Sequence, residues 1–174
     1  MDDNNKPMHL HIFTDGSVNP QLKVGYGAYL VVSDLSVSLD LLKDRDLLKK
    51  TVKVKHFEQT SSTKLELQTV LWALGEMITL ANGSDVTLTV HTDSQNIIGL
   101  AARRSRLEQS NYFSSKNKRL NNYELYQEFY RLTSKIKCEL VKVKGHKASH
   151  KKNEIDKLFS LVDRASRNAL RENP

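Results

Sequence analysis

Clustered and alternating apolar residues predict five strands along the chain. Residues 10–13 lead into the polar segment 14–17, and an aromatic and β-branched run follows at residues 26–32, so we expect two strands joined by a loop. Residues 50–57 alternate apolar and polar side chains, which is the period of a half-exposed third strand. The remaining strands are predicted at residues 86–91 and 140–143.

Apolar residues at helical spacing predict the helices between and after these strands. Residues 64–80 carry this pattern, and Thr63 followed by Glu66 matches a capping box at the helix start. Residues 96–135 are mainly helical but are interrupted by a basic loop at 109–122, and residues 155–170 form the last helix. We therefore predict an α/β fold, a mixed five-stranded sheet with helices on both faces.

Composition favours one compact domain with a polyanionic partner. The 174 residues are 39% hydrophobic, and we expect a single domain over residues 1–174 with a flexible segment at 1–8. A net charge of +7 makes nucleic acid a plausible partner. The single Cys138 suits a reducing compartment, and the sequence shows neither a signal peptide nor an apolar run of about 20 residues. We expect a cytoplasmic protein that does not contact membranes.

Three acidic residues stand where the predicted elements begin or end. Asp15 and Asp93 each follow an apolar strand, so neighbouring parallel strands would bring both carboxylates to one edge of the sheet. Glu66 lies in the first turn of a helix and could face the same point. Phosphodiester hydrolysis can use two divalent ions about 4 Å apart, and hard ions such as Mg²⁺ prefer carboxylate oxygens.

Four short motifs occur in the order seen in ribonuclease H, and the chain resembles that family over nearly its whole length. The motifs are Thr14-Asp15-Gly16-Ser17, Lys64-Leu65-Glu66-Leu67, Thr92-Asp93-Ser94-Gln95 and Lys144-Gly145-His146. The resemblance implies a ribonuclease H-like fold and hydrolysis of the RNA strand of an RNA/DNA hybrid with Mg²⁺ or Mn²⁺. It also implies that Asp15, Glu66 and Asp93 are metal-binding catalytic acids and that His146 is a mobile proton carrier.

The family places a fourth acid early in the last helix, where this sequence offers two residues. Asp156 lies ten residues after His146 and Asp163 seventeen after, so the two acids stand on one helix face about two turns apart. Spacing from the histidine favours Asp156. The local pattern Val162-Asp163-Arg164-Ala165 resembles the family better, and we predict Asp163, with Asp156 as the alternative.

By the same resemblance, Asp15 would bridge two ions, the fourth acid would hold the ion that activates water, and Glu66 with Asp93 would hold the ion at the leaving oxygen. The products would carry 5′-phosphate and 3′-hydroxyl ends. Five polar residues match positions that contact the hybrid, where a protein can read the RNA 2′-hydroxyl in the minor groove. They are Ser17, Asn19, Ser62, Thr63 and Gln95.

Two features depart from the family pattern. Ser62 and Thr63 stand where an Asn pair is common before the helical glutamate, which shortens the hydrogen-bonding reach. The basic region lies where many members carry a handle for the DNA strand, but it lacks the tryptophans common there, and its phosphate contacts would add affinity without sequence choice. Its cations are Arg103, Arg104, Arg106, Lys116, Lys118 and Arg119.

The rival hypotheses are a non-catalytic module that binds a hybrid or duplex RNA, and a DNA-directed nuclease of the same fold. The intact acids argue against the first, and Gln95 with Gly145-His146 argues against the second. We expect a monomer. The leucine-rich insert at residues 35–48 has no functional interpretation, and we expect a packing helix there.

Overall fold

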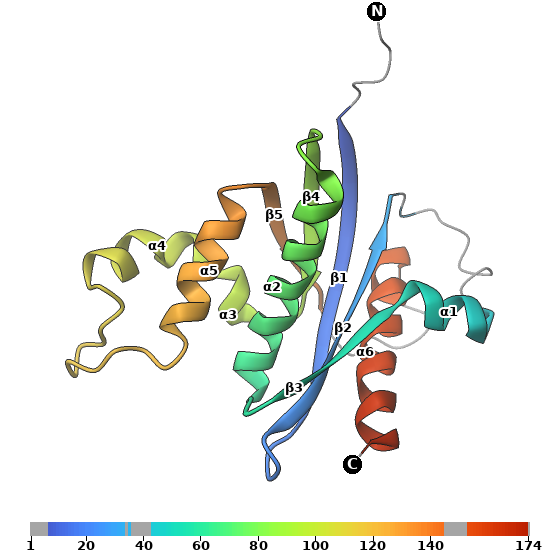
Figure 1. The fold of residues 1–174 in the computed structure, drawn as a ribbon, viewed down its shortest axis with the longest axis horizontal. Helices are drawn as coiled ribbons and strands as arrows, with labels where there is room; N and C mark the ends of the chain where they lie inside the picture. The colour runs from blue at the N-terminus through green and yellow to red at the C-terminus, as the bar shows by residue number, and fades with distance from the viewer. Residues whose placement is uncertain (1–6, 34, 36–42, 145–152, 174) are drawn as a thin grey trace, which may run out of the picture.

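The computed structural model describes residues 7–33, 35, 43–144 and 153–173. The described part forms a five-stranded sheet in the order β3-β2-β1-β4-β5. Strand β1 pairs antiparallel with β2 and parallel with β4, β2 pairs antiparallel with β3, and β4 pairs parallel with β5. The predicted mixed five-stranded α/β fold is confirmed (Figure 1). The strands are β1 (Met8–Asn19), β2 (Val24–Val32), β3 (Lys53–Glu58), β4 (Val86–Thr92) and β5 (Lys137–Lys142).

Six helices complete the described part of the chain. They are α1 (Arg45–Thr51), α2 (Ser62–Ala81), α3 (Gln95–Ile98), α4 (Leu100–Gln109), α5 (Tyr123–Thr133) and α6 (Glu154–Glu172). Helices α2 and α6 cover opposite faces of the sheet, while α4 and α5 extend to one side of it (Figure 1). No helix within the described ranges is long and apolar enough to cross a bilayer.

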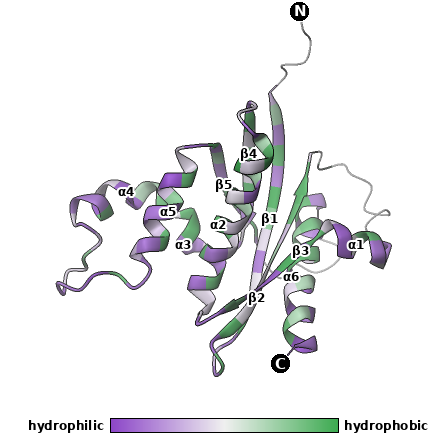
Figure 2. Ribbon diagram, viewed as in Figure 1, coloured by the Kyte–Doolittle hydropathy of each residue, from purple (hydrophilic) through white to green (hydrophobic). Residues whose placement is uncertain are grey.

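Alternation along β1 divides the core between the two faces. Ile12 belongs to the cluster that α2 and α5 cover, whereas its neighbour Phe13 belongs to the cluster under α6. Both side chains are fully buried, because successive residues of a strand point to opposite faces. Figure 2 shows hydrophobic and hydrophilic residues alternating along the helices, and on α6 the buried side chains include Leu158, Phe159 and Val162.

Strand β1 is longer than predicted, and this is the main correction to the predicted fold. Residues 14–17 do not form a loop, because they stay paired with β2 as far as Asn19 opposite Val24. At the other end Met8 is already in the strand, and its N–H donates to the carbonyl of Asp85 at 3.0 Å. The flexible segment predicted at 1–8 therefore does not include Met8, and residues 1–6 lie outside the described ranges.

The other differences concern where elements begin. Residues 50 and 51 belong to α1 instead of the third strand, and β5 begins at Lys137 instead of residue 140. Helix α2 is capped by Ser61, whose side chain accepts from Lys64 N–H, so the capping box predicted from Thr63 and Glu66 is wrong. A helix is present in the region 35–48 where α1 covers residues 45–48, but Leu47 is exposed there, and residues 36–42 lie outside the described part.

Candidate active site

The parallel pairing of β1 with β4 places Asp15 and Asp93 at one edge of the sheet. The last partners in this ladder are Phe13 and His91, and each acid lies two residues beyond its member of that pair. Beyond this point β1 continues along β2, with Asp15 opposite Ala28, while β4 ends at Thr92. The shared edge that the sequence predicted is therefore present, although Asp15 lies within a strand.

Three glycines let α2 approach this edge closely enough to bring in Glu66. A Cβ on Gly16 would stand 2.9 Å from Leu65 Cδ2, and one on Gly25 would stand 2.7 Å from the same atom. A Cβ on Gly27 would overlap Thr69, which lies one turn further along α2. Because Glu66 follows Leu65 directly, this close crossing places its carboxylate beside Asp93 and Ser94, whose charge and hydroxyl both act on it.

Helix α6 supplies the fourth acid from the opposite face of the sheet. The side chain of Asp163 hydrogen-bonds with that of Asp15, and its carboxylate also pairs with Arg167 at 3.0 Å. Ser166 is fully buried, and its hydroxyl lies 3.1 Å from the hydroxyl of Ser17 on β1. This contact holds the middle of α6 against the strand that carries Asp15.

Asp156 has a structural position two turns earlier in the same helix. Its carboxylate accepts from Asn153 N–H at 3.1 Å, and the Asn153 side chain accepts from Asp156 N–H at 2.9 Å. These two bonds form the capping box of α6, and Asp156 is 6% exposed. Of the two acids that the sequence left open, the structure brings Asp163 to Asp15 and uses Asp156 as a helix cap.

The grouping of acids makes Asp15 hard to ionise. Burial, the hydrogen bond with Asp163 and the negative charge of Asp93 together raise the pKa of Asp15 to about 8, against a smaller opposite effect of the Gly16 N–H. Burial and the charge of Asp93 also raise the pKa of Glu66, although the Ser94 hydroxyl opposes that shift. A positive charge at this edge of the sheet would relieve the repulsion.

A divalent cation fits this donor set by its chemistry. Carboxylate oxygens are the ligands that hard divalent ions prefer, and the close approach of Asp15 to Asp163 and Asp93 places like charges where a cation would offset them. Over the described residues, no three Asp, Glu, His or Cys side chains are arranged as a ready-made ion site. The acids interact in pairs instead, Asp15 with Asp163 and with Asp93, and Glu66 with Asp93.

The predicted hybrid-contacting residues lie at different distances from the acids. Ser17 is two residues from Asp15, but its hydroxyl contacts Ser166. Asn19 lies at the end of β1, where its side-chain oxygen accepts from Gln21 N–H and Leu22 N–H and so shapes the turn into β2. Their contact with a hybrid stays a prediction.

Ser62 and Thr63 are exposed in the first turn of α2, one turn before Glu66. Gln95 is the first residue of α3 and is exposed two residues after Asp93. Its side-chain oxygen accepts from Lys142 Nζ at 2.9 Å. His146, the predicted proton carrier, lies outside the described residues.

The basic region is the loop between α4 and α5 together with α4 itself. Arg103 donates to the Asn96 carbonyl at 2.6 Å and Arg104 to Glu108 at 2.8 Å. Both arginines, which were predicted to contact phosphates, therefore have hydrogen-bond partners within the protein. Arg119 lies over the rings of Phe113 and Tyr123, at 4.9 and 4.6 Å from their centroids. Phenylalanine and tyrosine thus supply aromatic surface in a region that has no tryptophan.

Comparison with known proteins agrees with this arrangement. The sequence profile of the family described as RNase H matches residues 7–165, which include both ends of the acid cluster, Asp15 and Asp163. The chain belongs to the RNase H family. It is also similar to a protein of Treponema denticola named "Ribonuclease H", with 26% identity over 162 residues that cover 87% of this chain and 94% of the relative. Membership of the RNase H family supports ribonuclease activity on RNA/DNA hybrids.

Several residues that shape this candidate site could not be predicted from the sequence. Ser94 caps α3 and contacts Glu66, and Ser166 contacts Ser17, but a lone serine carries no signal that would reveal either contact. Lys142 contacts Gln95 because β5 lies beside β4, a pairing that the sequence did not specify. Gly16, Gly25 and Gly27 are evident in the sequence, but nothing local indicates that a helix packs against them.

Proposed function

We propose that this protein is a metal-dependent endoribonuclease that hydrolyses the RNA strand of RNA/DNA hybrids with two divalent ions, Mg²⁺ or Mn²⁺. The observation that carries the proposal is the convergence of Asp15 in β1, Asp93 just after β4, Glu66 in α2 and Asp163 in α6 at one edge of the sheet. These residues are 148 positions apart at their extremes, so the convergence is a property of the fold. Family membership supports the substrate class.

Asp15 is the residue best placed to serve both ions, because it interacts with Asp163 on one side and Asp93 on the other. Asp15 with Asp163 would hold one ion, and Asp15 with Glu66 and Asp93 the other. When bound, the two ions supply an activated water and stabilisation of the leaving oxygen. His146 would carry a proton and help release the product, which would bear a 5′-phosphate and leave a 3′-hydroxyl.

The chain's own groups would position the RNA strand against these acids. Gln95 and Ser17 each lie two residues from an acid, so a hybrid at the acid cluster would lie within reach of polar side chains that can contact a 2′-hydroxyl. The net charge of +7 and the stacked Arg119 support binding of phosphates away from the cut.

Cleavage of an end-labelled RNA/DNA hybrid, with and without Mg²⁺, tests this proposal. Metal-dependent cutting of the RNA strand alone is expected, with duplex DNA and duplex RNA left intact. Asp15→Asn should lose several kcal/mol of transition-state stabilisation, a fall of roughly a thousandfold or more in rate, while hybrid binding persists. Binding without cutting by the unaltered protein would instead indicate a non-catalytic module, cutting of duplex DNA a DNA-directed nuclease, and cutting by the Asp15 variant a different metal site.

A further inference from the structure

The contact between Lys142 and Gln95 joins two exposed side chains from different elements. Lys142 is the last residue of β5 and pairs with Thr92 at the end of β4, and Gln95 follows three residues later at the start of α3. This parallel pairing puts the lysine beside the amide, and Lys142 Nζ lies 2.9 Å from Gln95 Oε1. Figure 1 shows β5 and the start of α3 on the same side of β4.

The chemistry of the two groups fixes which way the amide faces. An ammonium group has three donors and no acceptor, so only the oxygen of the Gln95 amide can face Lys142. The nitrogen, Nε2, is then turned away from the lysine, and among the described residues it has no hydrogen-bond partner. Gln95, two residues beyond Asp93, therefore presents a hydrogen-bond donor to a ligand that binds beside it.

A donor and an acceptor read a nucleic-acid minor groove differently. Every base pair presents acceptor atoms there, the purine N3 and pyrimidine O2, whereas only guanine adds a donor, its N2 amino group. In hybrids and RNA this groove is wide and also displays 2′-hydroxyl groups, which can accept a hydrogen bond. A side chain that can only donate meets an acceptor at every base pair, while one that can turn its oxygen outward can select guanine.

We propose that Lys142 is a positioning residue that holds the donor side of the Gln95 amide toward the hybrid and so keeps this contact indifferent to base sequence. The inference rests on the proposed function, because it needs a hybrid at the acid cluster. It adds to that function a residue that would prevent base preference at one contact.

The test compares hybrids that carry guanine or inosine at each position around the cut, since inosine lacks only the N2 amino group. The unaltered protein should cut both at the same rate. Lys142→Met removes the donor that holds Oε1, frees the amide to turn, and should create a guanine preference at one position. The expected preference is roughly two- to tenfold, the range that one neutral hydrogen bond contributes. Lys142→Arg, which also only donates, should restore indifference.

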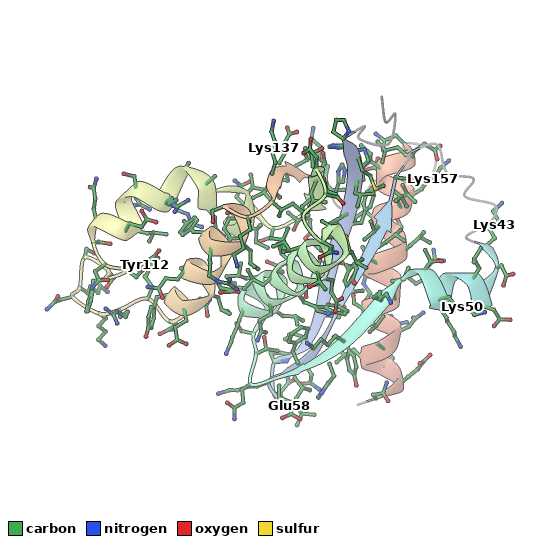
Figure 3. The ribbon with its side chains drawn as sticks, turned by 45° about the horizontal axis from the view of Figure 1, so that its top comes forward. Lys43, Lys50, Glu58, Tyr112, Lys137 and Lys157 are labelled. Carbon is green, nitrogen blue, oxygen red and sulfur yellow. The ribbon has the colours of Figure 1, made fainter. Side chains whose placement is uncertain are left out.

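Two controls separate this effect from loss of charge. Lys137→Met removes the same charge from the other end of β5, where Lys137 is exposed (Figure 3), and should create no guanine preference. Adding Gln95→Leu to Lys142→Met should abolish the preference, because the amide that reads guanine is gone.

The proposal is overturned if Lys142→Met cuts guanine and inosine hybrids equally, whatever its overall rate. A preference that survives Gln95→Leu would overturn it as well, because another group would then be reading the base. Failure of the unaltered protein to cut any hybrid would refute the proposed function itself, and this outcome is recognisable before any variant is made.

Discussion

Replacing Gly27 by alanine tests whether the glycines set the distance between α2 and the sheet. The added methyl would overlap Thr69 Oγ1 and would lie 3.0 Å from Thr69 Cγ2 and 3.1 Å from Thr69 Cβ, where ordinary contact begins at 3.4 Å. Rotation of the Thr69 side chain cannot remove the contact with Cβ, so α2 or β2 must shift. Overpacking of this kind costs about 1–3 kcal/mol. For a domain of this size the melting temperature should fall by about 2–12 °C.

Thermal unfolding followed by circular dichroism measures this cost, and two further variants control it. Gly75→Ala makes the same change inside α2, where an added Cβ meets nothing within 4 Å, and it should stabilise the protein by about 0.5–1 kcal/mol. Thr69→Ala removes Oγ1 and Cγ2, so Gly27→Ala should cost at least about 0.5 kcal/mol less in that background. An unchanged melting temperature for Gly27→Ala, or strictly additive costs with Thr69→Ala, would refute the reasoning.

Two further predictions concern the two acids of α6 and the single cysteine. Asp163→Asn should abolish cleavage with little effect on the free energy of unfolding. Asp156→Asn should weaken the capping box by about 1 kcal/mol, measured by chemical unfolding, and leave kcat unchanged. The reverse pattern would make Asp156 the fourth acid. Burial and the charge of Glu139 raise the pKa of the Cys138 thiol from 9.0 to about 11. Alkylation of the folded protein by iodoacetamide at pH 8 should therefore be roughly a hundredfold slower than alkylation after unfolding in urea. Equal rates in the two states would contradict this burial.

The sequence was sufficient for the order of elements because their patterns are local. The period of residues 64–80 predicted α2 closely, and Asn82 ends the helix in a left-handed conformation. The first residue of α2 was harder to predict. Three successive hydroxyl residues at 61–63 can each cap a helix, and only the bond from Lys64 N–H to Ser61 distinguishes them.

The sequence was sufficient to predict which residues form the candidate site but not how they are arranged in space. Asp15-Gly16 reads as a turn in isolation, yet Gly16 pairs with Gly27 across two strands because α2 needs both positions without side chains. The choice between Asp163 and Asp156 depended on how the last helix meets the sheet. That orientation comes from long-range contacts such as Ser17 with Ser166, which no local pattern encodes.

The hydroxyl contact between Ser17 and Ser166 joins residues 149 positions apart. Under the proposed function, this separation has a consequence for the timing of activity. Translation must reach residue 163 before the acid beside Asp15 exists, and α6 must then dock on β1 against a large loss of chain entropy. A partly synthesised chain would therefore carry only three of the acids, and a chain whose α6 is undocked would bring only three of them together. Neither would cut, so nuclease activity would report completion of the whole fold.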